Sequence, residues 1–294
     1  MPVDYRYHIG SFVAIFLALL LGILVGIGLA PNPEELNRVV GGLKQQYRET
    51  QQAKEDELNR LKQERSQYEA LAKEAVSGLI RDRLKGRRVA LVLDHDFGRD
   101  PVPDRLRALM KQAGASLSST TTITRDFVTM PSELRQKVSQ RLSLYPPPGV
   151  HYRSLIAETV ARDLAQGRNE LILELQALNL LRTSADSDYR LPVDSVLILG
   201  GSSSSGDSSP ERIDLPMIAE LLRLGVRVVG CESSQAANSA IPLYKSKGIS
   251  TVDDAETLAG QMAIVLALGG VNGHFGVNAT ADRFLPDLST ADRR

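Results

Sequence analysis

Three short stretches of the sequence carry residue types that could do chemistry. The first is Asp94, His95 and Asp96, which follow an apolar run; one histidine between two carboxylates could ligate a metal ion. Adjacent residues of a strand point to opposite faces of a sheet, so the three side chains cannot easily converge. A solvated turn is therefore the favoured alternative.

The second stretch is a loop rich in glycine and serine. It contains Gly200, Gly201, Ser202, Ser203, Ser204 and Gly206. The loop follows a predicted strand and precedes a predicted helix, which is where doubly wound folds bind ligands, and its backbone N–H groups could bind an anion. It lacks the Lys-Ser/Thr pair of a P-loop and the Gly-x-Gly-x-x-Gly spacing, so an empty, mobile connection is the favoured alternative.

The third candidate is the single cysteine, Cys231, which follows a predicted strand and precedes Glu232. A thiolate could act as a nucleophile beside a base, or bind a soft metal ion together with other Cys, Met or His residues. The sequence shows no such cluster around it, so a structural cysteine is favoured. No catalytic constellation emerges elsewhere, and we expect that the protein is not an enzyme.

The elements that hold these residues begin with an apolar N-terminal segment. Residues 9–30 include no charged residue, and about 20 apolar residues suffice to cross the hydrocarbon core of a membrane. A cleaved signal peptide is the alternative, but the apolar run is too long and Pro31 follows the one plausible cleavage point. We predict an uncleaved anchor over residues 1–32 in contact with membrane lipid, and a body exported from the cytoplasm.

Small residues recur every four positions along the predicted anchor. They are Ala14, Ala18, Gly22, Gly26 and Ala30. Such a stripe lets two helix backbones approach closely in a membrane, so it predicts self-association. Small residues are common in membrane helices, which leaves an unpaired helix as the alternative.

Residues 33–85 predict a long, highly charged helix. Apolar residues recur at a spacing of four, three and four (Leu36, Val40, Leu43 and Tyr47), and the pattern resumes after an all-polar stretch at residues 50–57. This is typical of a coiled coil with an interrupted centre, whereas a solvated single helix is the alternative. Together with the small-residue stripe, it favours a parallel two-stranded stalk and hence a homo-oligomer.

From residue 86 onwards, short apolar runs alternate with amphipathic segments. Strands are expected at residues 88–93, 115–123, 193–200, 226–230 and 249–252, and helices at 101–113, 210–224 and 253–268, with helical pieces in 131–182. This alternation predicts an α/β domain over residues 86–294 with a Rossmann-like, doubly wound, mostly parallel sheet. The formal net charge of +0 and the aromatic content of 5% argue against a nucleic-acid partner.

The sequence also resembles a known family. Residues 4–9 (DYRYHI), the apolar stretch at 11–19 and the glycines Gly22 and Gly26 are similar to the MctB-like family of bacteria, which is named for a mycobacterial copper transport protein. The strand near Val89, the glycine near position 200 and the closing stretch around 273–277 and 285–286 look similar too. The resemblance therefore covers essentially the whole chain.

The resemblance implies a role in copper homeostasis, efflux or tolerance, with copper as the metal concerned, and an envelope location that is the outer membrane in the mycobacterial relatives. It transfers no metal-ligand motif onto residues of this sequence, and no cofactor is established. Because one membrane helix has no water-filled interior, transport would require an oligomer or an envelope protein partner. The alternative is a dimeric, membrane-tethered scaffold that binds a ligand or partner without transporting metal.

Overall fold

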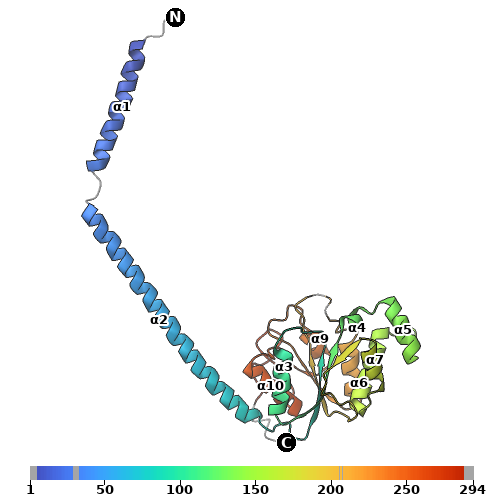
Figure 1. Ribbon diagram of the computed structural model, residues 1–294. Coiled ribbons are helices and arrows are strands. Elements are labelled where there is room, and N and C mark those ends of the chain that lie inside the picture. The colour runs from blue at the N-terminus through green and yellow to red at the C-terminus, as the bar shows by residue number, and fades with distance from the viewer. Residues whose placement is uncertain (1–4, 29–32, 205, 207, 288–294) are drawn as a thin grey trace. The chain divides into compact units, whose positions relative to one another are not determined.

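The computed structural model describes residues 5–28, 33–204, 206 and 208–287, without the side chains of residues 5–9, 27, 33–36 and 39 (Figure 1). The chain divides into two compact units, one within residues 1–69 and the other within 70–294. The first unit holds helix α1 (Tyr5–Gly28) and most of helix α2 (Pro33–Ile80), and the second holds the sheet and the remaining helices.

Helix α1 covers most of the predicted anchor. Its large apolar side chains from Phe12 to Val25 are exposed. In the part of the chain that the structure describes, no helix combines the length and apolar character needed to cross a membrane, so the described residues do not support the predicted span over 9–30. A Cβ added at Gly22 or Gly26 would meet no described atom within 4 Å, while Ala30 lies outside the described residues.

Helix α2 runs for 48 residues, which confirms the predicted long charged helix, although it ends at Ile80 rather than at residue 85. Ion pairs between residues one helical turn apart stabilise it, with 3.0 Å between Arg60 Nε and Glu64 Oε1. Its large apolar side chains are exposed, among them Leu43, Leu58 and Leu61. Pairing of two copies along these residues stays a prediction.

Within the described residues, the second unit is built on one sheet of seven strands. They are β1 (Arg88–Leu93), β2 (Ser116–Ile123), β3 (Leu181–Thr183), β4 (Ser195–Leu199), β5 (Arg227–Cys231), β6 (Ser250–Val252) and β7 (His274–Phe275). Their order across the sheet is β3-β2-β1-β4-β5-β6-β7, and all neighbours are parallel except β2 and β3. The predicted α/β class and mostly parallel sheet are confirmed, with β3 and β7 as strands that the sequence did not indicate.

Helices cover both faces of this sheet (Figure 1). They are α3 (Val102–Gln112), α4 (Arg125–Thr129), α5 (Ser132–Leu142), α6 (Tyr152–Gln166), α7 (Glu170–Ala177), α8 (Asp214–Arg223), α9 (Ile241–Ser246) and α10 (Leu258–Gly269). Side chains of α3 and α10 form one core with residues such as Leu91 and Leu197, and side chains of α6 to α9 form the other with Val92 and Ile198. Buried parallel strands read as apolar runs because both faces are covered in this way.

Helix α10 begins at Leu258 rather than at the predicted residue 253. The side chain of Thr257 caps it, since Thr257 Oγ1 accepts a hydrogen bond from Gly260 N at 2.9 Å. Asp253 and Asp254 precede the helix and are buried. Asp253 and Asp254, which were predicted to lie in the first turn of this helix, therefore belong to the loop between β6 and α10.

Candidate functional site

The chain order of the strands reverses between β1 and β4. The chain leaves β1 towards β2 on one side and returns to β4 on the other, so the carboxyl ends of β1 and β4 flank the position where doubly wound sheets bind ligands. Asp94 N donates to Leu199 O at 3.0 Å, and Gly200 N donates to Cys231 O at 2.8 Å. The three stretches singled out from the sequence thus lie along one edge of the sheet.

The side chains of Asp94, His95 and Asp96 do not converge. Asp94 is buried, and His95 Nδ1 lies 2.5 Å from Asp94 Oδ1. Asp96 is exposed and accepts a hydrogen bond from Arg182 Nη2 at 2.7 Å. Two of the three residues are therefore buried rather than solvated. Within the described residues, no group of three or more His, Cys, Asp or Glu side chains is arranged to hold a metal ion.

A second buried carboxyl group lies near Asp94. Asp214 is the first residue of α8, and Tyr244 OH in α9 donates to Asp214 Oδ2 at 2.6 Å. Burial, reinforced by the charge of Asp94, raises the pKa of Asp214 to about 8. Burial also raises the pKa of Asp94, against the opposing effect of His95. Asp214 is therefore largely protonated at neutral pH.

Cys231 is a core residue. It is completely buried in the apolar cluster that contains Leu199 and Val252. Burial, together with the Glu232 and Asp94 carboxylates, raises the pKa of its thiol well above the usual value. The side chain is thus a neutral thiol, which is neither an activated nucleophile nor a prepared metal ligand.

The glycines at the ends of β4 and β5 make room for a tyrosine. A Cβ at Gly200 would overlap the hydroxyl of Tyr244, and a Cβ at Gly230 would overlap its ring. Tyr244 is completely buried and reaches Asp214 through this gap. The glycine at position 200 therefore has a packing role that its sequence context did not indicate.

The first residues of the loop that starts at Gly200 are fixed by packing and by backbone hydrogen bonds. Gly201 has a φ of 76° and leaves no room for a Cβ beside Glu232. Ser202 and Asn238 exchange two backbone hydrogen bonds, of 3.1 and 2.9 Å, while Ser203 and Ser204 are exposed. At Gly206 a Cβ would meet no described atom within 4 Å.

The charges around this loop do not suit an anion, which its backbone N–H groups could otherwise bind. Asp94 follows β1, Asp214 opens α8 close enough for the charge of Asp94 to raise its pKa, and the Glu232 carboxylate accepts from Ser239 Oγ at 2.6 Å. These groups carry or can acquire negative charge, and like charges in a buried setting repel strongly. The electrostatics therefore favour a hydrogen-bond donor over a phosphate at the switch point.

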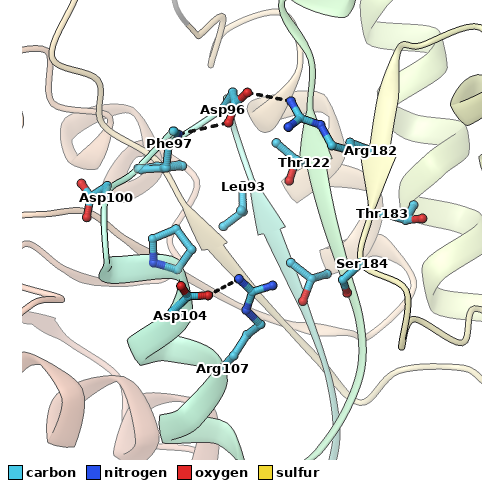
Figure 2. Close-up of a pocket in the computed structure, with 13 residues that line it drawn as sticks. Leu93, Asp96, Phe97, Asp100, Asp104, Arg107, Thr122, Arg182, Thr183 and Ser184 are labelled. Atoms are coloured by element: carbon cyan, nitrogen blue, oxygen red, sulfur yellow. Dashed lines mark hydrogen bonds and ion pairs between the residues drawn. The ribbon is translucent and has the colours of Figure 1, made fainter.

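A cavity of about 210 Å³ lies on the side of β1 that faces β2, away from β4 (Figure 2). Its floor is formed by Leu93 of β1 and by Thr120 and Thr122 of β2, and α3 forms one wall. The opposite wall is β3 and the residue after it, and the loop from β1 to α3 forms the rim. Arg107 and Arg182 line it from the two walls. Sequence reasoning missed these residues, although the Ser/Thr-rich composition of strand β2 was a signal.

The fold and this polar edge define an α/β protein of the doubly wound class with a helical N-terminal part. Residues 3–286 match the family model described as "Copper transport outer membrane protein, MctB". The chain belongs to this family, which confirms the resemblance read from its sequence. Relatives called "Copper transporter MctB" in Mycobacterium tuberculosis and Mycobacterium bovis are 21% identical over 307 residues, covering 93% of this chain and 96% of theirs.

Proposed function

We propose that this protein is a membrane-anchored envelope protein that takes part in copper homeostasis. The observation that carries the proposal is the family match, which extends over residues 3–286 and so includes both the helical part and the sheet domain. The mycobacterial relatives that bear the name of a copper transporter cover nearly the whole chain.

The test is the copper tolerance of a strain that lacks the gene. Complementation with the full-length chain is compared with complementation by residues 33–294, which lack α1 and the anchor sequence. The proposal expects that only the full-length chain restores growth in elevated copper, with both proteins present at similar levels on an immunoblot. Unchanged copper tolerance on deletion would refute it.

Insertion of α1 into a membrane accounts for its exposed apolar side chains. The part of α1 with described side chains is shorter than the hydrocarbon core of roughly 30 Å, whereas the whole helix of 24 residues rises about 36 Å at 1.5 Å per residue. Its side chains are described for residues 10–26, and the neighbouring sequence at 9 and 27–30 adds no charge. Retention of the full-length chain in membranes washed with alkaline carbonate, and release of residues 33–294, would support the anchor.

Pairing of two copies through α1 and α2 accounts for the stripe of small residues and for exposed side chains such as Leu43 and Leu61. In a membrane, such pairing is driven by close helix packing. Gly22→Leu and Gly26→Leu place bulk on the stripe where the single chain offers open space, so they test pairing without disturbing the helix. Gly28 is equally open but lies off the stripe, which makes Gly28→Leu the matched control.

We expect a strong loss of crosslinked dimer in membranes for the two stripe variants and no loss for Gly28→Leu. Equal crosslinking in all variants would remove the stripe as the cause of pairing. An oligomer, or an envelope partner, is needed for any transport because one helix encloses no aqueous path.

The alternative function is a membrane-tethered module that binds a ligand or partner and transports no metal. The polar cavity beside β1 favours this alternative, since it offers charged and hydroxyl groups at the ligand-binding edge of the fold. A deletion strain with normal copper tolerance would leave this alternative standing. Neither function involves catalysis.

A further inference from the structure

The floor of the cavity beside β1 combines Leu93 with hydroxyl side chains of β2, where this fold normally has hydrocarbon alone (Figure 2). Strands β1 (RVALVL) and β4 (SVLIL) are mostly aliphatic, as expected for buried parallel strands, whereas β2, on the other side of β1 from β4, reads SLSSTTTI. Thr120 and Thr122 of β2 both face the cavity. Thr120 is 4% exposed, and its Oγ1 has no hydrogen-bond partner among the described residues.

An unpaired buried hydroxyl is costly, at about 1–3 kcal/mol, and a valine would fill the same space without that cost. The hydroxyl of Ser184 at the opposite wall extends the same polar surface, whereas the side chain of Thr183 points away from the cavity (Figure 2). Ser184 Oγ lies 2.9 Å from Ser187 Oγ, so part of this surface is already held in place. A ligand with its own hydrogen-bonding groups can reach the hydroxyls of Thr122 and Ser184, whereas Thr120 Oγ1 has less than 1 Å² of accessible surface and lies beneath the surface of the floor.

Two ion pairs lie at opposite ends of the cavity (Figure 2). Arg182 Nη2 donates to Asp96 Oδ2 at 2.7 Å at one end, and Arg107 Nη2 is paired with Asp104 at the other. Each guanidinium has five N–H donors, and each carboxylate has several acceptor positions, so both pairs can bond further groups. The fifth charged residue of the lining, Asp100, accepts from Val102 N at 2.8 Å.

This charge arrangement selects against simple ions. An inorganic anion drawn to Arg107 or Arg182 would meet the carboxylate already paired with it, and a cation would meet the guanidinium. A hydroxyl group suits each pair better, because it can donate to the carboxylate and accept from the guanidinium at the same time. A neutral molecule with several hydroxyls would therefore use both ends of the cavity.

We propose that this cavity binds a single sugar ring. The volume of about 210 Å³ is below the roughly 300–1,000 Å³ of sites for larger ligands, which suits one ring rather than a nucleotide or a chain of sugars. Phe97 lines the rim, where its ring can cover the apolar C–H face of the sugar. The hydroxyls of the ring bond to the two ion pairs and to the hydroxyls of Thr122 and Ser184. This activity is separate from the proposed role in copper homeostasis.

The test uses the full-length protein in phospholipid nanodiscs, because detergents with sugar headgroups would occupy the site. Saturation-transfer NMR is recorded with methyl glucoside, methyl N-acetylglucosaminide and arabinose as probes, and with inorganic phosphate and glycine for comparison. The proposal expects at least one sugar to bind, and phosphate and glycine not to compete with it.

Two variants remove cavity groups and two matched variants leave the cavity intact. Thr122→Val and Arg182→Gln should weaken sugar binding at least about tenfold. Thr129→Val changes an exposed threonine of α4, and Arg141→Gln removes a surface arginine that is ion-paired with Glu174; both should bind as the unchanged protein does. Circular dichroism spectra identical to that of the unchanged protein verify that each variant is folded.

Three results would overturn the proposal. The first is that none of the sugars binds. The second is that sugar binding survives both Thr122→Val and Arg182→Gln. The third is that phosphate or glycine binds instead, and that the same two substitutions abolish this binding.

Discussion

Replacing Asp214 by asparagine should flatten the dependence of stability on pH. Asp214 is 1% exposed, and its pKa rises from 3.8 to about 8 because of burial and the charge of Asp94. Between pH 4 and 8 the folded state therefore keeps a proton that the unfolded state has released. The free energy of unfolding falls as pH rises through this window, by at most about 1.4 kcal/mol per pH unit for one proton.

The loss between pH 6 and 8 is thus at most about 3 kcal/mol. Asparagine resembles the neutral acid in shape, and its Oδ1 can accept the hydrogen bond of Tyr244. Asp214→Asn should match the unchanged protein near pH 4 and exceed its free energy of unfolding by up to about 5 kcal/mol at pH 8, of which at most about 3 kcal/mol arises between pH 6 and 8. Asp94 is also shifted upwards, so a smaller slope in the same direction remains in the variant.

The assay is urea unfolding of the full-length protein at pH 5, 6, 7 and 8, followed by near-ultraviolet circular dichroism of its tyrosines. Buried tyrosines such as Tyr244 report on the sheet domain in this signal. Asp282→Asn is the control, because Asp282 is exposed and Lys245 lowers its pKa. It should leave the slope between pH 6 and 8 unchanged. An equally steep slope in Asp214→Asn and the unchanged protein would refute the reasoning.

Two further predictions follow from the packing at the strand ends. Gly230→Ala should destabilise the domain by about 1–3 kcal/mol, because the added methyl overlaps the ring of Tyr244. Urea unfolding measures this change. The control is Gly78→Ala on α2, where a Cβ meets open space, and it should be neutral or stabilising. Cys231 should resist a thiol reagent at pH 8 until the protein is unfolded in urea, because its thiol is buried and its pKa is raised; rapid labelling of the folded protein would contradict this.

The sequence was most informative where a buried strand is a continuous apolar run. Strands β1, β4 and β5 were predicted within a few residues for this reason. Strands β3 and β7 have only three and two residues, too short for a periodic pattern. The start of α10 was misplaced because Asp253 looked like a first-turn acid, whereas its Oδ1 accepts from Val277 N at 2.8 Å and so holds a loop distant in sequence.

The candidate site was predictable only in its position. Asp94, Gly200 and Cys231 each follow an apolar run, and the rule for parallel sheets puts such residues at one edge. The partners of these residues were not predictable, since Asp214 and Tyr244 meet from two helices that are thirty positions apart. The cavity was not predictable for the same reason, because Arg107 and Arg182 line one cavity only through the antiparallel pairing of β2 with β3.

The copper content of cells tests the central claim most directly. A deletion strain that carries either the full-length gene or an empty vector is grown in sublethal copper, and cell-associated copper is measured by mass spectrometry, with zinc as the control metal. The account predicts that the full-length gene changes the copper content, lowering it if the protein acts in efflux, and leaves zinc unchanged. Equal copper in both strains, at verified expression of the protein, would contradict the proposed role.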